Sequence, residues 1–468
     1  MRIKQYYWIT TLAFFFVWFS ACKTSEKEII LPNFIIIFAD DLGYGDLSSF
    51  GHPTIKTPNL DQMAYEGMKL TQFYVAASIC TPSRAGLLTG KLPAKIGMAG
   101  ARRVLFPDSY GGLPTSESTI SSILSSAGYM TACIGKWHLG HKKEFLPTQH
   151  GFDYYFGIPY SNDMSPPNNN WDYAKAAFPP LPLMEGTEII ELEPDQSQLT
   201  RRYTDKALEF IDKNKSKPFF LYMPQTFPHV PLHVDSLNAR KSKRGLYGDV
   251  VQVLDKSVGA ILDKLYKLNI HENTFVIFTS DNGPWGWAGI NGGSAGLLRG
   301  KKGSTWEGGF RVPTIAWMPG SIPKNKIFNG VGSTLDLLPT FMSMAGINYD
   351  HESFDGRDIS SSFFLEKELS HPIFYYKQQE LIAMRNGAWK IFIKNPNPRG
   401  KEFYDDDFPI IFNLDEDPSE KYNLAKKNPA ILKRMVEEIN LHIKNNLLKP
   451  SLIDSIAPAY QAVFDQYN

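Results

Sequence analysis

Cysteine is scarce in this chain, whose 468 residues include only three: Cys22, Cys80 and Cys133. A protein of this size with so few thiols has no disulfide framework, so its stability must come from a hydrophobic core. Apolar residues make up 43% of the sequence, which is enough for a large core. Cys133 lies in an apolar stretch and is expected to be a small buried hydrophobe. Cys80 stands among polar residues and prolines and needs another explanation.

The chain also lacks an excess of charge of either sign. It contains 49 lysines and arginines against 48 aspartates and glutamates, for a formal net charge of +1. Electrostatic binding of nucleic acid needs a strongly basic face. We therefore expect no nucleic-acid partner. A disordered acidic or basic tail protein is excluded for the same reason.

The apolar run near the start of the chain, residues 6–19, is too short to span a membrane comfortably. Arg2 and Lys4 precede the run, a pattern that predicts a signal peptide over residues 1–21. The small residues before Cys22 resemble a bacterial lipobox, which implies cleavage there, lipid attachment to the Cys22 sulfur and a tether over residues 22–30. An ordinary signal peptide with a chance cysteine is the alternative. We expect an exported protein, periplasmic or at the cell surface, that meets the membrane through this anchor alone.

Short apolar runs that are typical of buried parallel strands alternate with helical patterns along the chain. The predicted strands are residues 34–38, 129–134, 219–223, 275–279 and 314–317. The predicted helices begin at Thr57-Pro58 and span residues 116–127, 203–214 and 246–268. This alternation predicts an open α/β sheet with helices on both faces.

The pattern changes after about residue 365. Three closely spaced strand-like segments, residues 373–376, 381–385 and 389–393, predict a small antiparallel sheet, and an amphipathic helix follows at about 430–445. We therefore place a boundary near Glu366, with a main domain over residues 31–365 and a C-terminal subdomain over residues 366–468.

Two of the predicted strands end in paired oxygen ligands. Asp40-Asp41 follows strand 34–38, and Asp281-Asn282 follows strand 275–279 after one serine. Sites in open α/β sheets form beyond the carboxyl ends of strands, so both pairs should project from one edge. Three carboxylates brought together repel one another unless a hard cation lies between them, so these pairs predict a metal site. For either pair alone, a loop cap is the simpler interpretation.

The segment 78–90 predicts a helix that begins near Pro82, with Cys80 at its N-terminus. Free N–H groups and the helix dipole favour an anion there, and Arg84 lies one turn inside, where it can reach back to a group at position 80. From the residues alone, Cys80 is either a thiolate nucleophile or a structural thiol.

Cys80-Thr81-Pro82-Ser83-Arg84, continuing into Leu87-Leu88-Thr89-Gly90, resembles the Cys-x-Pro-x-Arg signature of type I sulfatases. Further matches in the family's order are residues 135–140 (GKWHLG), 228–231 (PHVP), 279–283 (TSDNG) and 303–309 (GSTWEGG). Members similar to arylsulfatase A and N-acetylgalactosamine-6-sulfatase come closest. The resemblance implies an alkaline-phosphatase-like fold, that is, a doubly wound mixed sheet flanked by helices with a smaller C-terminal antiparallel-sheet subdomain.

The resemblance also implies the site. Cys80 would be oxidised to Cα-formylglycine (3-oxoalanine), whose hydrate is the nucleophile. The implied metal ligands are Asp40, Asp41, Asp281, Asn282 and the modified residue 80, with Ca²⁺ more expected than Mg²⁺. The implied catalytic residues are Arg84 to hold the hydrate, Lys136 and Lys302 to bind sulfate, His229 to protonate the leaving oxygen and His138 to deprotonate the second hydrate oxygen.

Some assignments stay open in the sequence. Lys301 adjoins Lys302, and His233 competes with His229. Ser161 and His150 are weaker candidates for substrate contact, and Trp285 and Trp287 either stack on a sugar or pack against their own loop.

The resemblance implies a sulfuric ester hydrolase, over residues 31–365, that removes sulfate from a sugar or glycan terminus and also from aryl sulfates. The expected partners are a sulfated carbohydrate and a formylglycine-generating or sulfatase-maturing enzyme. The alternative is a phosphate or phosphonate monoester hydrolase of the same superfamily. A glycan-binding lipoprotein with a dead site would lack a catalytic residue, and none is missing.

Overall fold

The computed structural model describes residues 31–165, 178–365, 367, 369–396 and 407–456. The expected signal peptide at 1–21, the lipidated Cys22 and the tether at 22–30 lie outside the described residues. Within the described part of the chain, no helix is long and apolar enough to cross a membrane.

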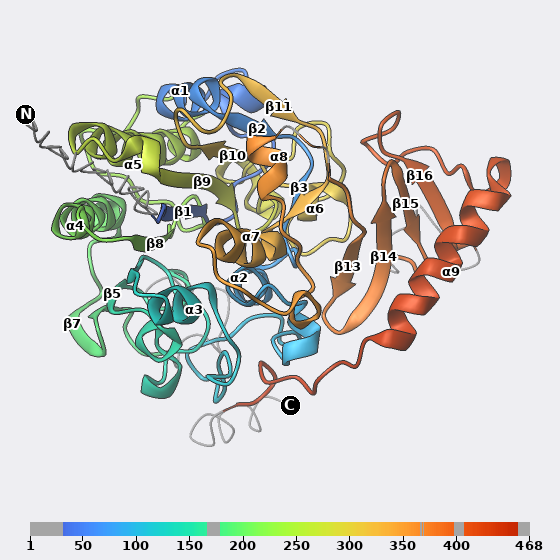
Figure 1. Cartoon of the computed structure of the whole chain (residues 1–468), viewed down its shortest axis with the longest axis horizontal. Helices are drawn as coiled ribbons and strands as arrows, with labels where there is room; N and C mark the ends of the chain where they lie inside the picture. Colours follow the sequence, from blue (N-terminus) through green and yellow to red (C-terminus); the bar gives the residue numbers. More distant parts are fainter. Residues whose placement is uncertain (1–30, 166–177, 366, 368, 397–406, 457–468) are drawn as a thin grey trace, which may run out of the picture. The chain divides into compact units, whose positions relative to one another are not determined.

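A ten-stranded mixed sheet forms the centre of the protein (Figure 1). Its order is β11 (Lys326–Phe328), β2 (Met68–Leu70), β10 (Thr314–Trp317), β9 (Thr274–Ser280), β1 (Asn33–Ala39), β8 (Phe219–Pro224), β4 (Met130–Ile134), β5 (Tyr154–Gly157), β6 (Pro182–Glu185) and β7 (Glu188–Leu192). Strands β9, β1, β8, β4 and β5 run parallel, whereas β10, β6 and β7 pair antiparallel with their neighbours. The five strands predicted from apolar runs are all present, and they lie side by side at the middle of the sheet, in the order β10, β9, β1, β8 and β4.

Helices cover both faces of this sheet (Figure 1), because alternate residues of its strands point to opposite sides. The face that carries Ile35 and Ile37 packs against α1 (Pro58–Glu66), α4 (Leu199–Asn214) and α5 (Leu246–Lys267). The face that carries Phe34, Ile36 and Phe38 packs against α2 (Cys80–Thr89), α3 (Ile120–Ser126) and α7 (Leu337–Met344). The short helices α6 (Glu307–Phe310) and α8 (Ser360–Phe364) and the two-stranded pair β3 (Phe73–Tyr74) and β12 (Gly332–Ser333) complete this part. The predicted fold class is confirmed.

Two predicted helix starts were wrong. The helix predicted from residue 116 begins at Ile120, because Thr119 and Ser122 form a reciprocal capping box there. The helix predicted from residue 203 begins four residues earlier, at Leu199, whose side chain is fully buried. The capping box fixes the first turn of α3, and burial of Leu199 fixes that of α4. The spacing of apolar residues does not determine either start.

The C-terminal part is the predicted antiparallel sheet, with the order β13 (Ile373–Lys377), β14 (Glu380–Asn386), β15 (Trp389–Phe392) and β16 (Ile410–Asn413). Helix α9 (Pro429–Asn445) lies along the sheet (Figure 1), and its buried residues Met435 and Ile439 pack on one face of it. The other face meets Tyr74, Trp306 and Phe310 of the main domain.

A buried ion cluster joins this sheet to the main domain. Lys390 on β15 lies 3.0 Å from Glu307 Oε1 and 2.8 Å from Glu420 Oε1, and it donates to the Thr305 carbonyl at 2.9 Å. The three charged side chains have no exposed surface. Removing one partner of such a cluster leaves an uncompensated buried charge, which typically costs about 3–5 kcal/mol.

Candidate active site

The two carboxylate-bearing strand ends meet, as the parallel register of β1 and β9 requires. Asp281 Oδ1 accepts a hydrogen bond from the Asp41 backbone N–H at 3.1 Å, and the Asn282 amide donates to Asp41 Oδ1 at 2.7 Å. Asp40, Asp41, Asp281 and Asn282 are all buried. The sequence therefore placed the four side chains correctly at one edge of the sheet.

Cys80 is the first residue of α2, and its sulfur lies 3.7 Å from Asp40 Oδ1. The helix start is polar in sequence yet lies in the interior, because Cys80 is 2% exposed and every residue of α2 is buried. Burial raises the pKa of the Cys80 thiol to about 12, although Lys136 and Lys302 oppose the shift. An unmodified thiolate nucleophile is therefore disfavoured at neutral pH.

In the unmodified chain Arg84 contacts carboxylates rather than the Cys80 thiol, and its expected contact with the hydrate at position 80 stays a prediction. Its guanidinium donates to Asp281 Oδ2 at 2.8 and 3.1 Å and to the Lys136 carbonyl at 2.9 Å, and it lies 3.4 Å from Asp40 Oδ2. Among the described residues, no hydrogen bond joins Arg84 to the Cys80 sulfur. The arginine instead fixes the carboxylates and the loop that carries Lys136.

Lys136 follows β4 by two residues, and its backbone N–H donates to the carbonyl of Pro224 at the end of β8. The buried ammonium donates to Asp40 Oδ2 at 2.5 Å and to Ser161 Oγ at 3.1 Å. Burial alone would raise the pKa of Asp40, but the attraction of Lys136, His229 and Arg84 outweighs it and holds that pKa well below its usual range.

The side chains of the adjacent residues Lys301 and Lys302 make different contacts. Lys302 Nζ lies 2.7 Å from Asp41 Oδ1, whereas Lys301 Nζ lies over the Trp287 ring, 3.3 Å from its centroid. Asp41 raises the pKa of Lys302 against the opposing effect of burial, so this lysine keeps its charge. Lys302, the residue preferred from the sequence, is the one that faces the cluster.

His229 lies in the loop after β8 and faces the same carboxylates. Its Nε2 is 3.6 Å from Asp41 Oδ2 and 3.5 Å from Ser161 Oγ, while Nδ1 donates to the Val230 carbonyl at 2.6 Å. Burial and Lys302 lower the pKa of His229. His233, the competing residue, packs near the Phe227 ring instead.

His138 adopts a left-handed backbone conformation with φ of 60°. Its Nε2 donates to the Leu105 carbonyl at 2.9 Å, and its buried Nδ1 has no hydrogen-bond partner. Burial, with Lys136 and Arg84, lowers the pKa of His138 well below its usual value, so the ring is neutral. The proton on Nε2 leaves the Nδ1 lone pair ready to accept another.

The weaker candidates divide. Ser161 contacts both Lys136 and His229, so it belongs to the site. Trp285 also borders the site, since its ring centroid is 4.9 Å from that of His229. His150 is 2% exposed and its ring packs against Trp137, and its contact with substrate stays a prediction.

The balance of charges in the site weakens the inference of a metal ion from carboxylate repulsion alone. Three cationic side chains already offset the three carboxylates, so repulsion alone does not require a metal ion. Other observations indicate one. Ligand atoms of Asp40, Asp41, Cys80 and His229 all lie within 4.8 Å of one another. The Asn282 Oδ1 is a buried acceptor without a partner. These oxygen donors fit a hard divalent cation such as Ca²⁺ or Mg²⁺.

Residues 32–347 match the sulfatase family, and residues 368–459 match the family described as the C-terminal region of aryl-sulfatase. The chain belongs to the sulfatase family. This sulfatase is 38% identical to arylsulfatase A of Bos taurus, over 84% of this chain and 83% of that protein. It is 36% identical to N-acetylgalactosamine-6-sulfatase of Canis lupus familiaris, over 88% and 86% of the two chains.

A solved structure agrees with these relatives. The crystal structure of Ps i-CgsB in complex with k-i-k-neocarrahexaose matches with a TM-score of 0.78 at 32% identity, covering 94% of this chain and 97% of that one. The protein is thus an enzyme that hydrolyses sulfate esters, which ranks the sulfatase interpretation above the phosphate and phosphonate alternative.

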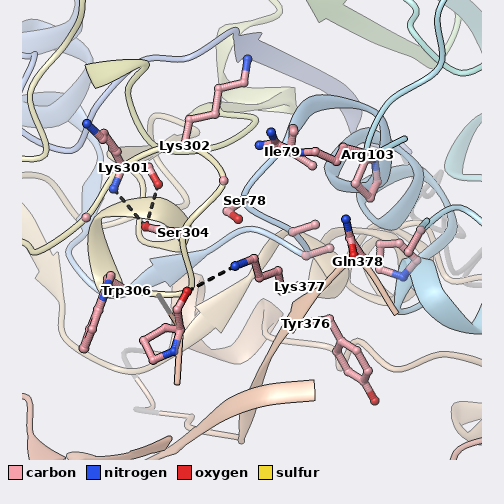
Figure 2. Close-up of a pocket in the computed structure, with 18 of the residues that line it drawn as sticks. Ser78, Ile79, Arg103, Lys301, Lys302, Ser304, Trp306, Tyr376, Lys377 and Gln378 are labelled. Carbon is pink, nitrogen blue, oxygen red and sulfur yellow. Dashed lines mark hydrogen bonds between the residues drawn. The ribbon is translucent and has the colours of Figure 1, made fainter. Parts of the chain in front are cut away.

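A cavity of about 750 Å³ adjoins the cluster at Lys302 and at the start of α2 (Figure 2). Its lining also includes Arg103, Lys377 and Gln378, which the sequence did not single out. These residues lie in unrelated segments without a shared motif, so only the fold brings them together.

Proposed function

We propose that this sulfatase removes sulfate from sugars through a formylglycine at position 80. The observation that carries the proposal is the position of the Cys80 side chain, within ligand distance of Asp40, Asp41 and His229. The lysines that face those carboxylates, Lys136 and Lys302, supply donors for a sulfate group. Charge develops on the leaving oxygen as the S–O bond breaks, so fixed cations beside the sulfate stabilise the transition state.

In the first half-reaction, one hydroxyl of the hydrated aldehyde loses its proton to solvent, its oxygen attacks sulfur, and the ester S–O bond breaks. The leaving alkoxide takes a proton from His229 Nε2. That nitrogen faces Asp41, Ser161 and the site interior, while Nδ1 is committed to a backbone carbonyl. The lowered pKa of His229 makes it a strong acid once protonated, and an incoming sulfate anion favours the protonated form.

In the second half-reaction, His138 Nδ1 removes the proton from the other hydroxyl of the sulfated hydrate. The aldehyde C=O re-forms, the C–O bond to sulfate breaks, and sulfate leaves with the bonding electron pair. Water then adds to the aldehyde and restores the hydrate. His138 suits this role because its Nδ1 is buried, neutral and unpartnered in the described structure.

The metal is proposed to be Ca²⁺, held by Asp40, Asp41, Asp281, Asn282 and the modified residue 80. Such an ion polarises a sulfate oxygen and favours an anionic attacking oxygen. Burial and Asp40 raise the pKa of Asp281 to about 7, and a bound cation favours its ionised form. Arg84 holds that carboxylate in place through two hydrogen bonds.

The proposed substrates are sulfated carbohydrates. The support is the names of the similar proteins: a sulfatase of an N-acetylgalactosamine 6-sulfate and a structure that contains a carrahexaose. Conversion of Cys80 is assigned to a sulfatase-maturing enzyme. Because the sulfur is almost fully covered, that enzyme must reach the segment before the chain has folded.

The direct test is a screen of defined sulfated mono- and oligosaccharides, with protein whose residue 80 has been identified by mass spectrometry. Matched phosphate esters form the second arm. We expect turnover only with formylglycine at position 80 and faster turnover of the sulfates. Faster turnover of the phosphates would reverse the assignment. Full activity of the protein with an unmodified Cys80 thiol would contradict the formylglycine mechanism.

We further propose export with a lipid on Cys22, on the basis of the residues that precede it. Cys22→Ser should release the protein from the membrane fraction without changing its turnover of sulfate esters. Equal membrane association of the variant and the parent chain would contradict the anchor.

A further inference from the structure

We propose that the cavity beside Lys302 binds a second anionic group of the substrate, a sulfate or a carboxylate on the sugar next to the one that is desulfated. The inference rests on the proposed function, since it concerns the same substrate. Its consequence is a preference for multiply charged glycans over singly sulfated ones.

The charge of the lining carries this inference. Among the described residues that line the cavity, four are cationic, Arg103, Lys301, Lys302 and Lys377, and none is an aspartate or glutamate. The chain as a whole has almost equal numbers of the two signs. Figure 2 shows Lys302 at the top of the view, Arg103 at the upper right, Lys377 below the centre and Lys301 at the left. A concave surface of one sign concentrates ligands of the other sign.

Three of these cations have no acidic partner among the described residues. Lys377 Nζ reaches only the Pro396 carbonyl at 3.3 Å, and Lys301 lies on the Trp287 ring. No ion pair of Arg103 is formed in the described part of the chain, and its side chain is exposed. Lys302 differs, because Asp41 neutralises it. Three cationic side chains are thus available to bind an anionic group of a ligand: Arg103, Lys301 and Lys377.

The backbone holds Arg103 close to the catalytic segment. Arg103 has a left-handed conformation with φ of 71°, which is uncommon for a residue with a side chain. A Cβ at Gly303 would lie only 2.6 Å from Arg103 Nη2, so the guanidinium passes directly over the residue that follows Lys302. An anion at Arg103 is therefore close to the sulfate-binding lysine but separate from it, as a substituent on an adjacent sugar would be.

The rest of the lining suits a carbohydrate. Its volume lies within the range of small-molecule sites. Ala76, Ala77 and Ile79 give an apolar wall, and Tyr376 and Gln378 of the C-terminal sheet face them. Trp287, 76% exposed, adds an indole at the rim, a surface on which sugar rings pack.

The test measures equilibrium binding by calorimetry to the Cys80→Ala protein, which cannot consume its ligand. Three disaccharides share one scissile sulfate: the first carries no other charge, the second carries a sulfate on the neighbouring sugar, and the third carries a carboxylate there. Exposed ion pairs contribute about fivefold in affinity at most, so two contacts predict binding of a dianionic ligand that is tighter by up to about 25-fold at low salt.

In the same background, Arg103→Ala with Lys377→Ala should reduce that preference to about onefold, while Lys243→Ala, which removes an exposed lysine outside the cavity, should preserve it. A preference for the second or the third ligand identifies the anion as sulfate or carboxylate. Equal affinity for all three ligands, or a preference that survives the double substitution, overturns the inference. Hydrolysis of 4-nitrophenyl sulfate by the modified protein tests the proposed function separately.

Discussion

Replacing His229 by alanine should damage the hydrolysis of sugar sulfates far more than that of aryl sulfates. An alkoxide is a poor leaving group and needs a proton, whereas a nitrophenolate departs without one. General acids typically contribute about 10²–10⁴-fold. His229 is 3% exposed, and its Nε2 faces Asp41 and Ser161 inside the site. We expect a loss of about 10³-fold in kcat/KM for a sugar sulfate and less than about tenfold for 4-nitrophenyl sulfate.

The substitution also has a structural cost, which the assay must separate. It removes the hydrogen bond from Nδ1 to the Val230 carbonyl and leaves that acceptor unpaired, at about 1–3 kcal/mol. Kinetics are therefore measured well below the thermal midpoint, with His233→Ala as the control from the same loop. An equal loss on both kinds of substrate would refute the acid role, because a folding defect or a lost sulfate contact acts on both.

Three further outcomes are expected. Cys80→Ala should abolish turnover yet cost only about 1 kcal/mol in stability, because it removes one small buried group; an unfolded variant by circular dichroism would contradict this. Dialysis against a chelator should abolish activity and lower the thermal midpoint by roughly 5 °C, with Ca²⁺ restoring both; full activity in the metal-free protein would refute the metal site. His371→Ala should destabilise the fold more at pH 6 than at pH 9 in urea titrations. Asp336, 2.8 Å away, raises the pKa of His371 despite burial, so its stabilisation is complete below the unfolded-state pKa and is lost as pH rises through the folded-state pKa; a constant difference would exclude this pair.

The centre of the fold could be predicted because its strands are buried on both faces. A parallel central strand such as Phe34–Phe38 is apolar at every position, so it stands out without any partner. The edge strands could not be predicted this way. Strand β7 (Glu188–Leu192) is largely exposed and mixes charged with apolar residues, so only its pairing with β6 defines it.

Some residues of the candidate site could be predicted from the sequence, and others could not. The carboxylate pairs follow strand ends, and the sheet topology alone brings them together. Side-chain direction cannot be read from spacing, so the ion pairs of Arg84 with Asp40 and Asp281 could not be predicted from the sequence. Arg103 and Lys377 carry no motif, and their approach depends on how the C-terminal sheet packs on the main domain. The roles of the catalytic residues stay predictions until they are measured.

The ion cluster of Lys390, Glu307 and Glu420 has a consequence for how this protein can change over time. Glu307 lies five residues beyond Lys302, so loss of the chain after residue 365 would remove Lys390 and leave the buried Glu307 with Arg311, 3.8 Å away, as its remaining cationic partner in the described main domain. We expect such a truncated enzyme to lose activity, although it would keep every residue of the candidate active site. The segments before and after residue 365 must therefore change together during evolution. Either one can be replaced by a homologous segment only if the new segment keeps the charge that pairs with the other, Glu307 on one side and Lys390 on the other.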